Sequence, residues 1–279
     1  MTFKIVTDST ADLPPELARE LGVTVVPAYV RFGDKVYRDR VDISEDELYH
    51  RLLHDPIYPQ TTQPSPQDFA DVYQKLSQEA EGIISIHITS KLSGTYNSAL
   101  QGKELVKNKC PIEVIDSRVL TMSLGLLVIA ATTIARSASS IQQVVAEVKQ
   151  TIPSIHFLAL LDTLKYLAKG GRIGNVKALL GSVLNVKPML GIKDGEFVPV
   201  CQVRTRAKGI DKLFDFVKNA TNIQDLAVVY NTTPEDAQTL IERIGLIFPK
   251  ERIRLARLGP ALGVHGGPGI LSVAFRESV

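Results

Sequence analysis

The sequence has 279 residues, of which 44% are hydrophobic and 22% are charged, a composition typical of a soluble globular protein with one large or two smaller domains. Its formal net charge is only +2, so the composition gives no reason to expect binding to nucleic acid or to an anionic membrane surface. The two cysteines, Cys110 and Cys201, lack CxxC or metal-ligand spacing, so we expect reduced, buried thiols in a cytoplasmic protein.

We expect neither a signal peptide nor a membrane-spanning helix in this sequence. The N-terminus becomes polar at Thr7-Asp8, too early for a signal peptide. The most apolar window, Val119–Ile134, contains four hydroxyl residues and is followed by Arg136, so it is too short and too polar to cross a bilayer. A helix buried between layers of secondary structure is the better interpretation of this window.

Strands alternate with helices over the first half of the chain, which predicts a parallel sheet with right-handed crossovers. We expect strands at Phe3–Val6, Val23–Val30, Ile83–Ile88 and Ile112–Ile115, and a hairpin at Arg31–Arg38. Helices are expected after Asp12 (a candidate cap) up to Gly22, at 44–53, 65–76 and 119–134, and from about Tyr96. Prolines exclude regular structure between Pro59 and Ser65, so we place Thr61 and Thr62 in an ordered loop.

The pattern changes after a helix expected at Ile141–Lys149. Strands are expected at His156–Leu161, Pro188–Ile192, Phe197–Val203, Leu226–Val229, Ile253–Leu255 and Ile270–Phe275. Helices are expected at Asp162–Leu167, Asn175–Leu184, Arg206–Lys218 and Pro234–Ile244, and Asp194-Gly195 is a hairpin signal. We therefore predict an α/β protein with an N-terminal, Rossmann-like parallel-sheet domain at 1–152 and an α+β domain at 153–279.

The stretch Ile83–Leu100 is the strongest candidate for a binding site. A β-branched strand ends at the run Thr89–Asn97, which holds several hydroxyls, Lys91 and Gly94 just before a helix. Free N–H groups and the positive dipole end at a helix start favour an anion, and parallel sheets bind ligands at this carboxyl edge. The alternative is that Ser90, Ser93 and Thr95 only cap the helix.

Other candidate residues are ambiguous in sequence alone. His265 lies in the glycine-rich stretch Gly259–Gly269, which indicates backbone crowding or an ordinary turn with an exposed histidine. Arg172 follows Gly170-Gly171 and belongs either to a surface helix end or to a junction with a domain or partner. His50 and His54 have helical metal spacing, but the HExxH arrangement is absent and a solvated helix face is favoured.

Several enzyme signatures are missing from the sequence, among them GxGxxG, GxxxxGK[ST] and GxSxG. The enzymatic alternative is an acyl hydrolase or acyltransferase with Ser93 as nucleophile, His265 as base and Asp8 or Asp116 as its orienter. A phosphate-binding protein is a weaker alternative, because Lys91 is the only cation in the central loop.

The sequence resembles the DegV family of bacterial fatty-acid-binding proteins over essentially its whole length. The resemblance rests on segments that occur in the family's order: Thr7–Pro14, Thr61–Ser65, Ser90–Tyr96, Ile115–Ser117, Leu161–Ile173, Lys187-Pro188 and the glycine-rich stretch around His265. Thr62 stands where the family often has serine, so the resemblance leaves open whether Thr61 or Thr62 is the hydroxyl donor.

The resemblance implies two domains enclosing a tunnel for one long-chain fatty acid, with no metal and no cofactor. It implies that the protein itself is no enzyme but presents the carboxylate to a separate, DhaK-like fatty acid kinase, which forms an acyl phosphate. By motif, Thr61 or Thr62, Ser93 and Gly94 hold the carboxylate with His265 beside them, and Arg172 faces the kinase. Transient membrane contact during lipid exchange is compatible with this role.

Apolar residues of the buried helix are candidates for the wall of such a tunnel. Those we consider are Val119, Leu120, Met122, Leu124, Leu126 and Leu127. The same residues fit an ordinary hydrophobic core equally well, which is the usual role of such a helix.

Overall fold

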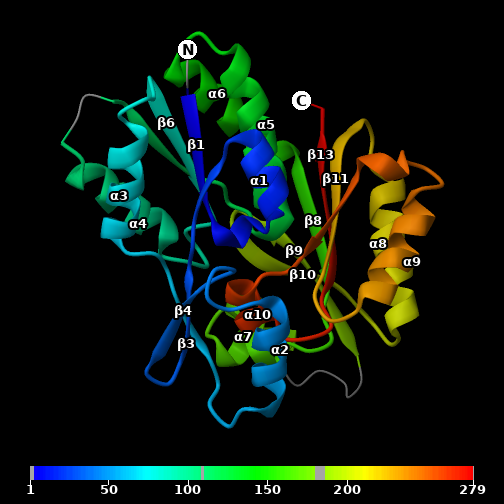
Figure 1. Cartoon of the computed structure of the whole chain (residues 1–279). Coiled ribbons are helices and arrows are strands. Elements are labelled where there is room, and N and C mark those ends of the chain that lie inside the picture. Colours follow the sequence, from blue (N-terminus) through cyan, green and yellow to red (C-terminus); the bar gives the residue numbers. More distant parts are fainter. Residues whose placement is uncertain (1–2, 108–109, 180–185, 279) are drawn as a thin grey trace.

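The computed structural model describes residues 3–107, 110–179 and 186–278, and it has an α/β fold built on three sheets (Figure 1). The first is a four-stranded parallel sheet in the order β2-β1-β6-β7. Its strands are β1 (Phe3–Asp8), β2 (Thr24–Val26), β6 (Gly82–His87) and β7 (Ile112–Asp116). Alternate residues of β1 and β6 face opposite sides, so both faces are buried under helices.

Helices cover both faces of this parallel sheet. One face packs against α3 (Pro66–Leu76) and α4 (Thr95–Leu105), the other against α5 (Thr121–Ser137) and α6 (Ile141–Thr151), and α1 (Pro15–Leu21) lies beside β2. Ser65 caps α3 in a full capping box with Asp68, as its sequence indicates.

The second sheet has six strands in the order β10-β9-β8-β13-β11-β12, with only β11 and β12 parallel. Its strands are β8 (Ile155–Leu160), β9 (Lys187–Lys193), β10 (Glu196–Val203), β11 (Ile223–Tyr230), β12 (Ile253–Arg257) and β13 (Leu271–Glu277). The outer face packs against α8 (Arg206–Lys218) and α9 (Pro234–Ile244). The inner face packs against α5, which also contacts β1 of the first sheet.

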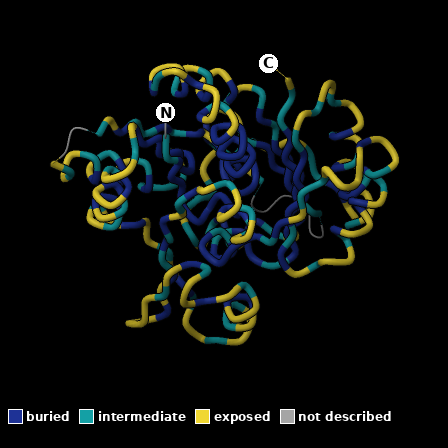
Figure 2. Tube along the Cα trace, turned by 45° about the horizontal axis from the view of Figure 1, so that its top comes forward, coloured by how far each residue is buried: buried dark blue, intermediate teal, exposed yellow. Residues whose placement is uncertain are grey.

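Helix α5 is therefore the central layer, and most of its residues are buried (Figure 2). This confirms the interpretation of the apolar window as a helix between layers. The hydrophobic cluster around α5 includes Ile84 of the first sheet and Ala274 of the second. Because one core joins both halves of the chain, the division at residue 152 stays a prediction.

The third sheet contains the hairpin expected at Arg31–Arg38, but its third strand was not predicted. The sheet is antiparallel, in the order β4-β3-β5, and consists of β3 (Tyr29–Phe32), β4 (Lys35–Arg38) and β5 (Gln60–Thr62). Helix α2 (Glu45–His54) packs with this sheet against α10 (Pro260–Gly266), burying Val30, Leu48 and Val264. The shorter elements are η1 (Ser9–Ala11), η2 (Ile152–Ser154), α7 (Lys165–Lys169), η3 (Gly174–Leu179) and η4 (Lys250–Arg252).

Three strand and loop predictions were wrong. The single strand Val23–Val30 is divided, because Pro27 cannot donate a ladder hydrogen bond and β3 joins a different sheet from β2. Residues 60–62 form β5 instead of a loop, since the prolines flank the strand without interrupting it. The glycine-rich stretch 259–269 contains helix α10, which starts with Pro260 in its first turn.

Two helix predictions also need correction. Asp12 does not cap α1, because the N-cap of this helix is Pro14. Asp12 has a φ of 52°, and its buried carboxylate accepts hydrogen bonds from Thr121 and Gly259. The helix predicted at 175–184 is a 3-10 helix as far as Leu179, and residues 180–184 lie outside the described residues. Cys110 and Cys201 are not joined in a disulfide, and both are half-buried rather than buried.

Candidate functional site

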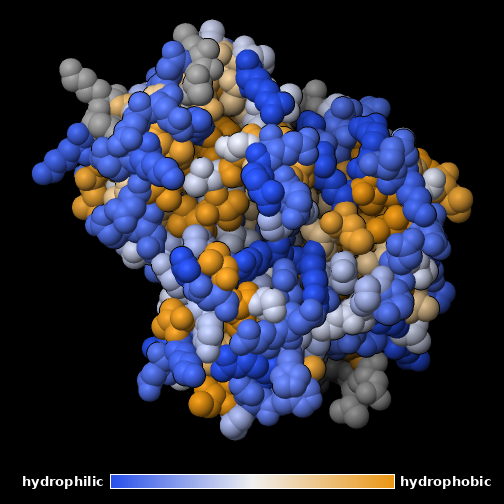
Figure 3. Space-filling view, in the orientation of Figure 1, coloured by the Kyte–Doolittle hydropathy of each residue, from blue (hydrophilic) through white to orange (hydrophobic). Residues whose placement is uncertain are grey.

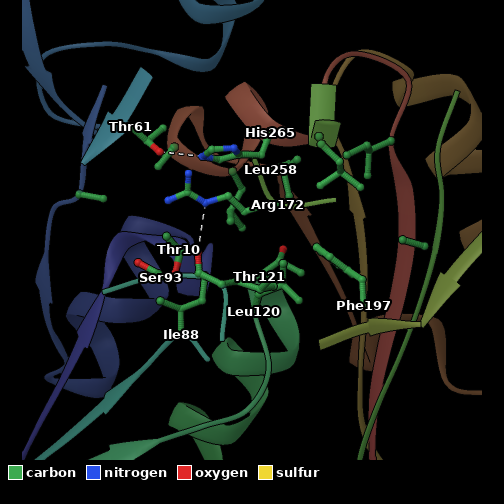
Figure 4. A pocket seen from close by; sticks show the side chains of 18 of the residues that line it. Thr10, Thr61, Ile88, Ser93, Leu120, Thr121, Arg172, Phe197, Leu258 and His265 are labelled. Atoms are coloured by element: carbon green, nitrogen blue, oxygen red, sulfur yellow. Dashed lines mark hydrogen bonds between the residues drawn. The ribbon is translucent and has the colours of Figure 1, made fainter. Parts of the chain in front are cut away.

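A cavity lies where the three sheets meet, with about 870 Å³ of space between its lining atoms, part of it open to solvent (Figure 4). Apolar side chains form most of the lining: Ala28, Ile88, Leu92, Leu120, Phe157, Ala159, Leu161, Leu167, Phe197, Leu258, Ala261, Leu262 and Ile270. Polar lining residues are Thr10, Thr61, Thr62, Gln63, Ser93, Thr95, Thr121, Arg172, His265 and Ser272. A mostly apolar cavity with a few polar groups is typical of a small-molecule site.

Thr61 and His265 meet at one end of the cavity. Thr61 lies on β5 and His265 on α10, and 2.6 Å separates Thr61 Oγ1 from His265 Nε2 (Figure 4). Burial, and to a smaller extent the positive charge of Arg172, lower the pKa of His265 to about 4. The imidazole is therefore neutral at neutral pH.

The surroundings of the His265 ring indicate its tautomer. Nδ1 is buried without a hydrogen-bond partner among the described residues, and it faces Gly170, where an added Cβ would lie 2.1 Å from it. A buried N–H without a partner is rarer than an unpartnered acceptor, so we assign the proton to Nε2. Nε2–H then donates to Thr61 Oγ1, which leaves the hydroxyl hydrogen of Thr61 available to another acceptor.

Arg172 lies at the cavity, not on a distant outer surface. It is half-buried; its Nε donates to the Leu92 carbonyl at 3.3 Å and one terminal nitrogen donates to the Gly170 carbonyl at 2.7 Å (Figure 4). No carboxylate of the described residues forms an ion pair with it, and it is the only charged side chain among the described lining residues. Its charge is therefore available to an anionic group in the cavity.

The central loop contributes Ser93 to the same cavity. Ser93 Oγ lies 2.9 Å from Thr95 Oγ1 and accepts from Thr95 N, while Ser90 Oγ donates to Asp116 at 2.5 Å. Capping thus explains only part of the hydroxyl cluster. Gly94, the N-cap of α4, is not a lining residue; the amide of Gln63 packs so closely that a Cβ at Gly94 would lie 2.9 Å from Gln63 Nε2.

Thr62 is exposed at the rim of the cavity, whereas Thr61 is half-buried. Successive residues of a strand point to opposite faces, so only one of the two can follow the direction of Thr61 toward His265. The contact with His265 therefore favours Thr61 over Thr62 as the inner hydroxyl.

The apolar residues around α5 were candidates either for the cavity wall or for ordinary core, and most of them are core; some lining residues were missed. Of the six candidates around α5, only Leu120 lines the cavity, and the other five are core residues. Part of the wall comes instead from β8 and the residue after it (Phe157, Ala159 and Leu161), where period-2 alternation was the available signal. The rest comes from α7, β10, α10 and the loops between elements. No sequence pattern marks Thr10, Thr121 and Ser272 as lining residues. They are far apart in the chain, and only the tertiary fold brings their hydroxyls to one cavity.

The arrangement does not support a nucleophilic triad at Ser93. Asp8 is committed to His87 Nδ1, at 2.9 Å, and Asp116 accepts from Ser90 and Arg118. Neither carboxylate orients His265, whose Nδ1 has no hydrogen-bond partner within the part of the chain that the structure describes. Across residues 3–107, 110–179 and 186–278, no group of three or more His, Cys, Asp or Glu side chains could hold a metal ion.

Comparison with known proteins identifies the family. A family model described as "Uncharacterised protein, DegV family" matches residues 2–278. This chain belongs to the DegV family. A DegV domain-containing protein from Caldanaerobacter subterraneus subsp. tengcongensis is 37% identical over 277 residues, 98% of either chain.

Solved DegV structures share the fold. A DegV-family protein from Thermus thermophilus described as binding fatty acid has a TM-score of 0.92 and 30% identity, covering 100% of both chains. A stearic acid-binding protein from Eubacterium ventriosum has a TM-score of 0.88 and 30% identity, covering 99% of this chain and 98% of its own. DegV from Bacillus subtilis, described as a fatty acid binding protein, has a TM-score of 0.90 and 26% identity over 100% of both chains.

None of the helices in the described parts of the chain has the length and apolar character needed to cross a membrane.

Proposed function

We propose that this DegV protein binds one long-chain fatty acid, with the hydrocarbon tail in the cavity and the carboxylate at Thr61, Ser93 and Arg172. The observation that supports this most directly is the asymmetry of the cavity. An apolar wall leads to hydroxyls and an arginine that lacks an ion pair among the described residues. A carboxylate supplies the charge and the acceptors that this end lacks.

The tail contributes most of the binding free energy. Burying roughly 14 methylenes, at about 0.8 kcal/mol each, releases on the order of 11 kcal/mol before the cost of association. Head-group hydrogen bonds add about 1–3 kcal/mol each and mainly fix the orientation of the ligand. The cavity offers an extended apolar surface to a hydrocarbon, while the face in Figure 3 mixes hydrophilic side chains with groups of apolar ones.

The proposed position of the carboxylate is within reach of a second protein. Thr62 and Gln63 are exposed at the rim beside Thr61, so this end of the cavity is next to solvent. We propose that the protein is a carrier without chemistry of its own that presents the carboxylate to a DhaK-like fatty acid kinase in the cytoplasm. Arg172, half-buried at this end, serves the carboxylate and contributes its outer part to the kinase contact.

Lipid extraction tests the binding proposal. Protein purified from cells is denatured, and the released lipid is identified and quantified by mass spectrometry. We expect a long-chain fatty acid in a near-equal molar amount. After delipidation, hexadecanoic acid should rebind more tightly than hexadecanol, which has the same tail without the carboxylate. Absence of fatty acid, or equal affinity for the alcohol, would contradict the proposal.

The carrier role needs a separate assay with the fatty acid kinase of the same organism, ATP and the loaded protein. We expect Ser93→Ala to retain fatty acid with modestly lower affinity and to lower acyl phosphate formation strongly. Ser90→Ala is the matched control, because Ser90 lies in the same loop but bonds to Asp116. Equal phosphorylation of wild type and Ser93→Ala would remove Ser93 from this role.

A further inference from the structure

The inner face of the six-stranded sheet carries three successive rows of residues under the cavity. Ser272 on β13 pairs with Ala159 on β8, and both are buried and line the cavity. Extending this register by one pair toward the end of β8 places Ile270 beside Leu161. In the other direction, Phe157 pairs with Ala274. Along β8, the side chains that face the cavity are therefore large at Leu161, small at Ala159 and large at Phe157.

The aromatic row extends across the edge of the sheet. Phe197 on β10 pairs with Ile192 on β9, and extending the β8–β9 register by one residue places Ile192 beside Phe157. Phe157 and Phe197 are the two aromatic carbocycles among the described lining residues. Phe157 is 8% exposed and Phe197 is half-buried.

This row lies across the cavity from Thr61 and His265. Leu161 follows β8 directly, and the chain then continues through α7 to Arg172, so the polar end lies beyond the carboxyl end of β8. Phe157 precedes Leu161 by four residues, which is about 13 Å along a strand. Figure 4 shows Phe197 across the cavity from Thr61 and His265.

We infer that Phe157 and Phe197 form the end of the tail channel and set the longest acyl chain that binds without strain, while Ala159 and Ser272 leave the passage that leads to it. This inference rests on the proposed function. It makes the length preference a property of four side chains on the mixed sheet rather than of α5.

The inference has a quantitative signature in binding. Each methylene that enters an apolar channel adds about 0.8 kcal/mol, which is about a fourfold gain in affinity per carbon. The logarithm of affinity therefore rises linearly with chain length until the tail meets the rings. Beyond that length, further carbons gain nothing or cost affinity through overpacking. The chain length at this break is the quantity to measure.

The experiment measures the dissociation constants of delipidated protein for saturated fatty acids from 10 to 22 carbons, by displacement of a fluorescent fatty acid. Phe197→Ala and Phe157→Ala should each move the break to longer chains and restore about fourfold per added methylene beyond the wild-type limit. Ala159→Leu should move it to shorter chains, with long acids weakened tenfold or more and short acids retained. Phe216→Ala is the control, because Phe216 lies on α8 and packs against the outer face of the same sheet.

An unchanged break in Phe197→Ala, Phe157→Ala and Ala159→Leu, with fatty acid still bound, would overturn the inference while leaving the proposed function intact. Failure of the wild type to bind any of the acids would instead contradict the proposed function. If Phe157→Ala does not fold, Phe197→Ala and Ala159→Leu still decide the question, since they predict shifts in opposite directions.

Discussion

Thr61 and His265 are 204 positions apart in the chain, yet Oγ1 and Nε2 lie 2.6 Å from each other at the polar end of the cavity. This contact joins the three-stranded sheet to helix α10. The contact also orients the Thr61 hydroxyl. Because Thr61 Oγ1 accepts a hydrogen bond from the imidazole, the hydroxyl hydrogen of Thr61 remains available to donate to a ligand.

The first prediction concerns the neighbouring threonines. Thr61→Val removes the hydroxyl that faces His265 while keeping the shape of the side chain, so we expect fatty acid affinity to fall about tenfold, or about 1–2 kcal/mol. Thr62→Val is the matched control and should change affinity by less than about twofold, because Thr62 is exposed. Displacement titration of both variants checks this. A larger effect of Thr62→Val would assign the donor role to Thr62.

The second prediction concerns the influence of Arg172 on His265. Because the guanidinium charge lowers the pKa of His265, Arg172→Gln should raise that pKa above about 4. Burial remains in the variant, so the pKa should stay below 6.5. NMR titration of the imidazole resonances measures this shift, and Arg204→Gln, an exposed arginine outside the cavity lining, is the control. An identical His265 titration in wild type and Arg172→Gln would contradict the placement.

The third prediction is a dependence of stability on pH. The pKa of His265 is about 4 when folded and 6.5 ordinarily, so between these values the unfolded chain binds a proton that the folded protein does not. The stabilising contribution is complete above pH 6.5 and is lost as pH falls toward 4, by up to about 3 kcal/mol. Urea unfolding should show a smaller loss over this range for His265→Gln. If the unfolding free energies of wild type and His265→Gln changed in parallel with pH, the lowered pKa of His265 would be contradicted.

The fourth prediction has the opposite sign and concerns Asp12. Burial raises its pKa to about 7 although Arg40 lowers it, so the folded protein holds a proton that the unfolded chain releases above about pH 4. Wild-type stability therefore falls as pH rises from 4 to 7, and Asp12→Asn escapes this loss. The variant should gain on wild type by up to about 4 kcal/mol between pH 4 and 8 in urea unfolding. If the difference in unfolding free energy between Asp12→Asn and wild type did not change with pH, the raised pKa of Asp12 would be contradicted.

The fifth prediction concerns the fit of Gly170 against His265. A Cβ at Gly170 would lie 2.1 Å from His265 Nδ1, so Gly170→Ala must displace either the ring or α7. We expect a loss of about 1–3 kcal/mol of stability and a weaker Thr61–His265 contact. Thermal unfolding and the imidazole NMR signals measure both effects. Unchanged stability and an unchanged imidazole spectrum would show that the ring is not held against Gly170.

Much of the fold could be predicted from local pattern. Helices α8 and α9 begin and end where their periodicity and flanking residues indicate, and the Asp194-Gly195 hairpin forms as expected. These elements depend on residues close in sequence. The hairpin at Arg31–Arg38 was predicted as well, but the third strand of its sheet was not, because the pairing of Val30 with Thr61 is decided by tertiary contacts.

The candidate site was predicted in composition more than in arrangement. Thr61, Ser93, Arg172 and His265 do line one cavity, while their binding roles stay predictions. Helix α10 was missed because its glycines disfavour a helix in isolation; Gly263 lies against Tyr49, and Gly267 just beyond the helix lies against Tyr166. The position of Arg172 beside the central loop depends on how two distant segments meet.

The cavity draws its lining from residues as far apart as Thr10 and Ser272. An occupant of the cavity would therefore contact segments from both halves of the chain. Ligand occupancy and the melting temperature should therefore change together. The ligand-bound protein should have a higher melting temperature than the empty protein, by an amount set by the ratio of the free ligand concentration to the dissociation constant. Release of cargo then coincides with the protein becoming more easily unfolded.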